Sequence, residues 1–90
     1  ENVGGSLIRM LPMQLEVLTP EKKLFSGEAK AVQFPGTDGL FQILNGHAPL
    51  IATLRAGDIR VETAQGATES IAINGGVVEV SNNVLSVLAQ

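Results

Sequence analysis

The sequence predicts an all-β fold, a two-sheet antiparallel β-sandwich of about ten short strands. From residue 13 onward, apolar residues alternate with polar ones at a period of two, as they do in strands with one buried face. Turn-forming Gly, Pro and Asn residues recur about every 8–12 positions, a spacing typical of sandwiches and barrels. No window of about 11 or more residues holds a helical apolar stripe free of Gly and Pro.

In the first half of the chain, two strands with clear ends are expected. One begins at Met13 and ends at Thr19-Pro20, because proline has no N–H to donate to a ladder. A second covers residues 28–34 and ends at Pro35-Gly36, which is a strong turn signal. Residues 48–56 carry β-branched side chains and a proline near their start, so they are expected to form a strand or an irregular segment.

The second half of the chain is expected to form hairpins. Turns are predicted at Gln65-Gly66, Asn74–Gly76 and Ser81–Asn83, since Gly and Asn tolerate the left-handed backbone conformation. The strands around these turns are predicted at residues 59–63, 70–73, 77–80 and 84–89.

The chain is long enough for one domain. Of its 90 residues, 44% are hydrophobic and 17% are charged, which is far from the composition of disordered segments. Residues 13–90 are predicted to form the domain, with Phe25, Phe34 and Phe41 as the large anchors of a core built from Val, Ile and Leu. Residues 1–12 lack the alternating pattern and are predicted to be a leader or a disordered extension.

Composition excludes several kinds of chemistry. Without cysteine there are no disulfides or thiolate zinc sites, and the single histidine, His47, cannot form a multi-histidine metal site. A net charge of −3 with no Tyr or Trp argues against nucleic-acid binding, and no apolar run is long enough for direct membrane insertion. The sequence contains no phosphate-binding loop or nucleophile elbow. We therefore expect no catalytic residue, no cofactor and no metal.

Lys22 and Lys23 leave one alternative open. They lie at a predicted hairpin end, and small β-sandwich carrier domains hold a prosthetic group on a turn lysine. The Met or Asp neighbours expected beside such a lysine are absent here. An unrelated small β-sandwich binding or prosthetic-group carrier module is thus the alternative to the assignment below.

The stretch from residue 34 to 54 differs from the rest of the chain. It holds three glycines, two prolines and the only histidine in one irregular segment, and Leu40 and Phe41 lie beside a Gly-rich turn. A solvated loop does not need such apolar residues, and loops on a rigid β scaffold often form binding surfaces. We therefore expect an interaction surface here rather than an enzyme site.

Seven short motifs follow one another along residues 13–90. They are Leu-Thr-Pro-Glu (18–21), Leu-Phe-Ser-Gly-Glu-Ala (24–29), Pro-Gly-Thr-Asp-Gly (35–39), Gly-His-Ala-Pro-Leu (46–50), Ala-Gly-Asp-Ile (56–59), Asn-Gly-Gly-Val-Val-Glu-Val (74–80) and Val-Leu-Ala-Gln (87–90). Each motif is weak alone, but in this order and spacing the chain resembles the N-terminal β-sandwich domain of the ε subunit of F-type ATP synthases.

The resemblance implies a non-catalytic rotor subunit of the central stalk that joins the γ subunit to the c-ring and couples proton flow to ATP synthesis. It also implies a peripheral position on the cytoplasmic face of the bacterial inner membrane. Matching the motifs places three residues at the γ-subunit interface: Thr19, His47 and Ala52. It places five at the c-ring interface: Asp38, Gly39, Leu40, Phe41 and Gln42.

The chain departs from the family pattern in two ways. Gln42 stands where many members have Gly, and Asn45 where they have Pro, which leaves the backbone shape of this segment open. Members usually continue into two C-terminal helices that restrain ATP hydrolysis and in some cases bind ATP. The chain as given reaches Gln90, so neither property is expected of it, whether it is a truncated or a naturally short form.

Overall fold

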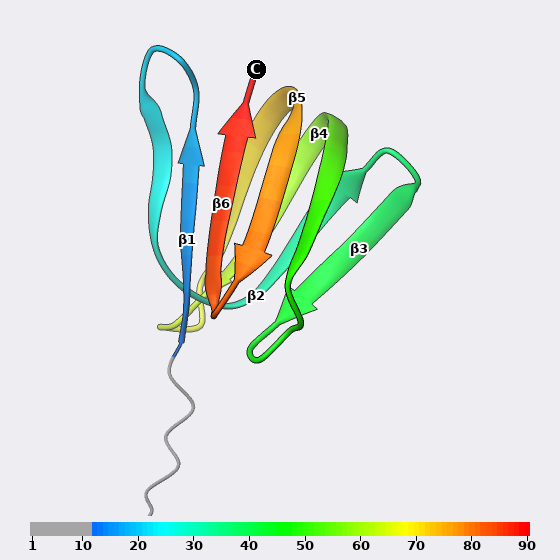
Figure 1. Ribbon diagram of the computed structural model, residues 1–90. Helices are drawn as coiled ribbons and strands as arrows, with labels where there is room; N and C mark the ends of the chain where they lie inside the picture. Colours follow the sequence, from blue (N-terminus) through cyan, green and yellow to red (C-terminus); the bar gives the residue numbers. More distant parts are fainter. Residues whose placement is uncertain (1–11) are drawn as a thin grey trace, which may run out of the picture.

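The computed structural model describes residues 12–90, which form six β-strands and no helix (Figure 1). The strands are β1 (Met13–Leu18), β2 (Lys23–Gly36), β3 (Gly39–Leu44), β4 (Leu50–Thr63), β5 (Thr68–Ser81) and β6 (Val84–Ala89). This part of the chain therefore has no helix that could cross a membrane. The leader or extension predicted at residues 1–12 lies outside the described residues, apart from Pro12.

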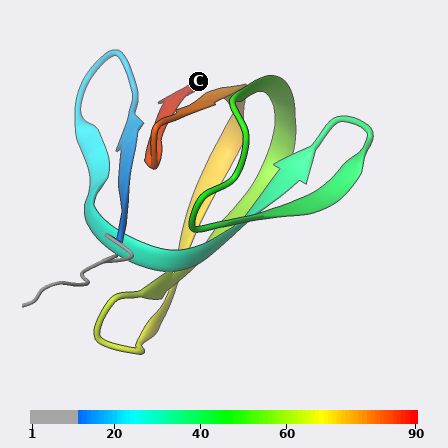
Figure 2. The ribbon, with the colours of Figure 1, turned by 60° about the horizontal axis from the view of Figure 1, so that its bottom comes forward.

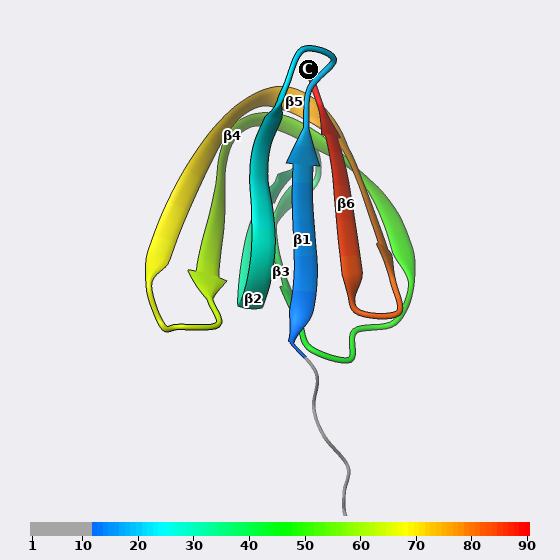
Figure 3. The ribbon, with the colours of Figure 1, turned by 90° about the vertical axis from the view of Figure 1, so that its left-hand side faces the viewer.

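The six strands form one sheet that folds over into two layers. Their order is β1-β6-β5-β4-β2-β3, and a further pairing of β1 with β2 closes the sheet on itself, so that it curls into a ring in Figure 2. β2, β4 and β5 each have 14 residues and pass from one layer into the other. Figure 3 shows β4 and β5 arching over together.

Two names are used below for these layers. Layer A contains β1, β6 and residues 23–29, 50–55 and 76–81 of the long strands. Layer B contains β3 and residues 31–36, 57–63 and 68–73 of the same long strands.

The predicted all-β sandwich is confirmed, but its strands are fewer and longer than predicted. The chain has six strands in place of about ten, because three of them bend between the layers without breaking. Each long strand supplies one segment to each layer, so the two layers together hold nine segments. The prediction therefore failed at the bends of the long strands: β4 and β5 in particular are each continuous where two separate segments were expected.

The turn predicted at Asn74–Gly76 is wrong, because β5 continues through it. Gly75 and Gly76 have φ angles of 131° and 153°, which side chains rarely allow, yet both stay paired with Arg55 and Leu54 of β4. A Cβ atom on Gly76 would overlap the carbonyl oxygen of Leu88. The two glycines thus bend β5 and let it approach β6 closely.

The turns predicted at Gln65-Gly66 and Ser81–Asn83 are confirmed. Asn82 and Asn83 adopt φ angles of 52° and 62°, the left-handed conformation that asparagine tolerates. At Thr19-Pro20 the first strand ends as predicted. Each of these signals marks a true reversal of the chain.

The irregular segment predicted around residues 34–54 is mostly regular. β2 continues through Pro35-Gly36 to pair Gly36 with Gly39 of β3, so the reversal falls two residues later than predicted, at Thr37-Asp38. Only residues 45–49, between β3 and β4, lie outside strands and this turn. The β2–β3 ladder extends this far because Gly36 and Gly39 approach closely: a Cβ atom on Gly36 would lie 2.6 Å from the Gly39 carbonyl oxygen.

One strand pair departs from the predicted antiparallel arrangement. β1 and β6, the first and last strands, run parallel, with registers from Gln14–Val84 to Leu18–Leu88. All the other pairings are antiparallel. Both strands alternate strictly between buried and more exposed residues, so each contributes one face to the core.

The core lies between the layers and consists mainly of aliphatic side chains. Phe34 is the one fully buried aromatic residue in the described part of the chain, while Phe25 and Phe41 are partly buried and pack against the core. Fully buried side chains come from every strand: Met13, Leu15, Val17, Val32, Phe34, Ile43, Ile59, Val61, Val78, Val80, Leu85 and Val87. Two of the three predicted anchors therefore sit at the margin of the core.

Candidate functional site

The five residues predicted to meet the c-ring lie in and after one hairpin turn. Asp38 is in the turn between β2 and β3, and Gly39 to Gln42 form the first part of β3. Asp38, Leu40 and Gln42 are exposed, with 63% of the Leu40 surface accessible. The structure thus keeps these residues together, with Asp38 in the turn and the other four on a regular strand.

Phe41 differs from its neighbours because its ring faces the core. The ring stacks on Phe34 with a centroid distance of 5.4 Å and an interplanar angle of 29°. Gly36 makes this position available, since a Cβ atom there would lie 2.8 Å from the Phe41 ring. Phe41 is consequently part of the support beneath the hairpin as well as part of its surface.

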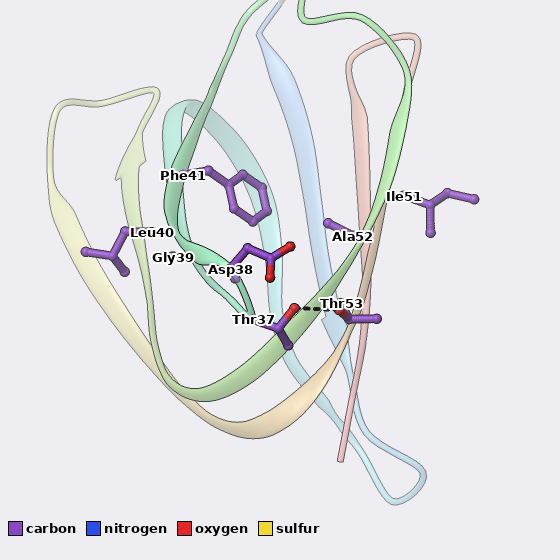
Figure 4. A pocket seen from close by; sticks show the side chains of 9 residues that line it. Thr37, Asp38, Gly39, Leu40, Phe41, Ile51, Ala52 and Thr53 are labelled. Carbon is purple, nitrogen blue, oxygen red and sulfur yellow. Dashed lines mark hydrogen bonds between the residues drawn. The ribbon is translucent and has the colours of Figure 1, made fainter.

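A pocket of about 460 Å³ opens between β3 and the first half of β4. Figure 4 shows Phe41, Asp38 and Ala52 around this space, while Leu40 and Ile51 point away on opposite sides. Thr37 and Thr53 join the two walls, by an N–H to carbonyl bond of 3.1 Å and a hydroxyl–hydroxyl bond of 2.9 Å. We call this opening the β3–β4 mouth.

The mouth brings together residues from both predicted interfaces. Its lining includes Asp38 to Phe41 from the predicted c-ring group and Ala52 from the predicted γ group. Asp38 is the only charged residue in that lining. The sequence motifs alone had assigned these residues to separate surfaces.

His47 lies in the exposed loop between β3 and β4. The N–H of His47 donates to the carbonyl of Leu44 (3.1 Å), and Nδ1 lies 2.7 Å from the carbonyl oxygen of Ala48. A carbonyl can only accept, so this contact requires the proton on Nδ1. The N–H of Gly46 donates to Asn83 Oδ1 (2.8 Å), which ties the loop to the β5–β6 turn.

Thr19 lies in the β1–β2 turn and organises it. Its hydroxyl accepts from the N–H of Lys22 (3.1 Å) and of Glu21 (3.3 Å), and its own N–H donates to the Lys22 carbonyl (2.8 Å). This turn and the β3–β4 loop are at opposite ends of the molecule in Figures 1 and 3. Thr19 and His47 are therefore not brought together.

The outer face of layer A exposes apolar side chains that the motifs did not indicate. Thr53, Val77, Leu88 and Leu18 form a cross-strand row over β4, β5, β6 and β1. Val77 and Leu88 are 40% and 64% exposed, and Ile51, two residues from Thr53, is 72% exposed. The sequence does carry a signal for this surface: Ile51, Val77 and Leu88 are apolar residues at the strand positions that alternate with the more buried ones.

The outer face of layer B carries a polar row instead. Gln42, Gln33, Arg60 and Ser70 are aligned across β3, β2, β4 and β5. Gln33 is partly buried and the other three are exposed. These two rows thus differ in chemistry, although Glu16 and Glu79 also lie outward on layer A, and Leu40 and Leu44 lie outward on layer B.

The described residues contain no cluster of metal-ligating side chains. No three His, Asp or Glu side chains among them lie close enough to hold a metal ion. Lys22 is in the β1–β2 turn, and Lys23 begins β2 with its Nζ 3.8 Å from Glu16 Oε2. Both ends of this ion pair are about half exposed, so it is a surface contact.

Comparison with known families gives a match over all the residues that the structure describes. Residues 12–90 match the family described as ATP synthase, Delta/Epsilon chain, beta-sandwich domain. The ATP synthase epsilon chain of Chlorobium limicola is 46% identical over 77 residues, which are 86% of this chain and 88% of that protein. That of Bordetella petrii is 41% identical over 80 residues, 89% of this chain and 57% of that protein.

Solved structures show the same fold at low sequence identity. A chain in the cryo-EM structure of the Euglena gracilis mitochondrial ATP synthase superposes with a TM-score of 0.82 at 20% identity, covering 98% of this chain and 56% of that one. A chain in the central stalk and c-ring structure from Tetrahymena thermophila gives a TM-score of 0.73 at 15% identity, covering 92% and 66%.

Proposed function

Because the chain belongs to the β-sandwich domain family of ATP synthase delta and epsilon chains, we propose that it is a non-catalytic subunit of the central stalk of an F-type ATP synthase. In this role it joins the γ subunit to the c-ring, so that proton flow and ATP synthesis are coupled. The observation that carries the proposal is family membership over residues 12–90. The subunit then sits peripherally on the cytoplasmic face of a bacterial inner membrane.

The γ subunit is the partner proposed for layer A. Ile51, Val77 and Leu88 expose apolar surface there, and exposed apolar residues grouped on one face of a small protein mark an interaction surface. Ala52, predicted to face γ, follows Ile51 on β4 and lines the β3–β4 mouth beside this face. Thr19 and His47 mark the two ends of the proposed contact, because the β1–β2 turn and the β3–β4 loop that contain them lie at opposite ends of the molecule (Figure 1).

The c-ring is the partner proposed for the β2–β3 hairpin. Asp38 and Gln42 offer two acceptors and a donor to polar loops, and Leu40 adds exposed apolar area. Phe41 holds the hairpin on the core through Phe34. In the proposed c-ring contact, Asp38, Leu40 and Gln42 therefore touch the partner, and Phe41 anchors the hairpin that carries them.

Coupling in reconstituted membranes tests this function. In the complete ATP synthase, the double change Asp38→Ala and Gln42→Ala is expected to reduce ATP-driven proton pumping while ATP hydrolysis continues. Asp58→Ala, an exposed residue of β4 in layer B, is the matched control and leaves pumping unchanged. Full pumping by the double variant contradicts the proposed c-ring contact.

Binding of the chain to the γ subunit tests the other half of the proposal. Purified γ is expected to co-elute with residues 13–90 in size-exclusion chromatography. If the wild-type chain forms no complex with γ, the central-stalk assignment fails. A modified lysine at Lys22 or Lys23, found by mass spectrometry, would instead favour the carrier-domain alternative.

A further inference from the structure

The sequence contains two asparagines that are followed directly by glycine, in Asn45-Gly46 and Asn74-Gly75. Asparagine is a thermally labile residue, because the backbone nitrogen of the next residue can attack its side-chain amide carbon and displace ammonia. Glycine in that next position favours the reaction, since it has no Cβ atom to hinder the approach and leaves the backbone free to rotate. Both pairs are therefore chemically able to react.

The second pair is held in place by the ladders of β5. Gly75 is buried and stays paired with Arg55 of β4, and its carbonyl accepts the N–H of Gln90 at 3.0 Å. Freeing the backbone at Asn74-Gly75 therefore requires β5 to separate from β4 at the bend between the layers. Strands of a core open only at a free energy close to that of global unfolding, so this pair is protected by the fold.

The first pair lies in a turn outside the strands. Asn45 and Gly46 are the central residues of a turn closed by the bond from the His47 N–H to the Leu44 carbonyl, 3.1 Å. Gly46 is exposed, and nothing lies within 4 Å of the place where a Cβ atom would stand. Exposed loops open at a small cost in free energy, so the backbone of this pair is released far more often than that of Asn74-Gly75.

The type of this turn shows that the pair must open before it can react. The φ of Gly46 is 82°, while Asn45 keeps a negative φ. Together with the closing hydrogen bond this defines a type II turn, in which the ψ of the first central residue is about +120°. Attack on Cγ needs the Gly46 nitrogen and the Asn45 Cβ on the same side of the Cα–C bond, and that ψ turns them apart. The closed turn is therefore the unreactive state.

A second hydrogen bond holds the turn closed. The N–H of Gly46, whose nitrogen is the attacking atom, donates to Asn83 Oδ1 at 2.8 Å. Asn83 itself is fixed, because its carbonyl accepts the N–H of Gln14 at 2.8 Å. The β3–β4 loop and the β5–β6 turn lie at the same end of the molecule in Figures 1 and 3. Asn83 thus restrains the reacting nitrogen from a neighbouring turn.

We propose that Asn45 is a site of spontaneous covalent modification, and that the Asn83 side chain limits its rate. When the turn opens, the Gly46 nitrogen forms a bond to Asn45 Cγ, the Cγ–Nδ2 bond breaks, and the Gly46 proton leaves with ammonia. Water then opens the resulting succinimide ring at one of its two carbonyls, which gives aspartate or isoaspartate. The two steps need no reagent other than water.

Either product changes the end of the sandwich that carries His47. Each adds a carboxylate to a chain whose net charge is −3. Isoaspartate also places the Cβ atom in the main chain, which lengthens the turn by one bond and removes the spacing for the hydrogen bond between Leu44 and His47. This inference is independent of the proposed function, because it involves neither the γ subunit nor the c-ring.

Peptide mapping of the complete chain by mass spectrometry tests the proposal. Trypsin releases residues 31–55, in which Asn45 is the only asparagine, and residues 61–90, in which fragmentation identifies Asn74. The conversion rate of each asparagine at neutral pH is divided by its rate in denaturant, where both pairs are open. This ratio is expected to be at least about tenfold higher for Asn45 than for Asn74, because it reports the cost of opening. Equal ratios, or no conversion of Asn45 in the folded chain, overturn the proposal.

Two variants at position 83 test the restraint on Gly46. Asn83→Gly keeps the positive φ but removes the acceptor oxygen, so Asn45 is expected to convert at least about threefold faster, the effect of losing one hydrogen bond. Asn83→Asp keeps an acceptor oxygen and is the matched control, with the wild-type rate. Circular dichroism checks that both variants are folded, and equal rates at Asn45 in the two variants overturn the role of Asn83. If Asn83→Gly does not fold, the comparison of Asn45 with Asn74 in the wild-type chain decides.

Discussion

The outer faces of layers A and B have the same construction but expose different side chains. Each has a row of four residues aligned across four strand segments. The row of layer A is Thr53, Val77, Leu88 and Leu18, and that of layer B is Gln42, Gln33, Arg60 and Ser70. Both faces belong to one continuous sheet, so backbone structure does not account for the difference.

The comparison separates what folding requires from what binding requires. Both layers bury apolar residues on their inner faces, as a two-layer core demands. A polar outer face, as in layer B, suits contact with water. Outward Val77 and Leu88 in layer A are exposed and add little to the core, and apolar residues grouped in this way are typical of a partner surface. The predictions below test this separation, beginning with the largest expected effect.

Gly76→Ala is expected to disrupt layer A and with it the whole fold. The added Cβ would overlap the Leu88 carbonyl, at a φ of 153°, so a loss of at least about 3 kcal/mol in unfolding free energy is expected. Urea denaturation measures it. Gly66→Ala is the control, because Gly66 also has positive φ, 92°, but open space around it; an equal loss there would show that conformation alone matters.

Phe41→Ala is expected to lower stability by about 2–3 kcal/mol, since a partly buried ring that stacks on Phe34 is removed. The thermal midpoint of the isolated domain should fall by roughly 10–20 °C. Leu40→Ala, the exposed neighbour, should change it little. An unchanged midpoint for Phe41→Ala would place the ring on the binding surface, not in the support between the two layers.

The double change Ile51→Thr and Leu88→Thr tests the apolar face directly. Threonine keeps a good strand propensity, so the fold is retained, but γ binding should weaken by about 30-fold, or about 2 kcal/mol. Arg60→Thr with Ser70→Thr makes the matched change on layer B and should leave γ affinity as it is. Equal losses on both faces, measured by calorimetry, would remove the distinction between them.

Glu16→Gln should have the smallest effect. Glu16 and Lys23 are 3.8 Å apart, and both are about half exposed, so their pair contributes less than about 0.5 kcal/mol. Glu79→Gln, an exposed residue aligned with Ser86 beside Glu16, serves as the reference. Urea denaturation at low and at high salt should give unfolding free energies for the two variants that differ by no more than this margin. A larger difference would show that the Glu16–Lys23 pair contributes to the stability of layer A.

Much of the fold could be predicted from sequence because alternation and turns are local signals. The strand from Met13 and the asparagine turn at 82–83 depend on neighbouring residues alone, and both were predicted correctly. The glycines at 75–76 were misread, because the same dipeptide serves a chain reversal or a bend, and only the approach of β6 distinguishes the two. The parallel pairing of β1 with β6 is equally non-local.

The candidate site was predictable only in part, for a related reason. Asp38 to Gln42 are contiguous, so a motif keeps them together. Ile51, Val77 and Leu88 come from three strands, and their alignment exists only once the register of β4, β5 and β6 is set. The β3–β4 mouth depends in the same way on the Thr37–Thr53 contacts.

The parallel pair of β1 and β6 determines how the domain carries mechanical load. Since the two strands point the same way, tension between the start of β1 and the end of β6 pulls them past each other along their length. The ladder from Gln14–Val84 to Leu18–Leu88 then bears the force at all its hydrogen bonds simultaneously, whereas peeling would break them one at a time. Tension applied between these two ends therefore loads the β1–β6 ladder in shear.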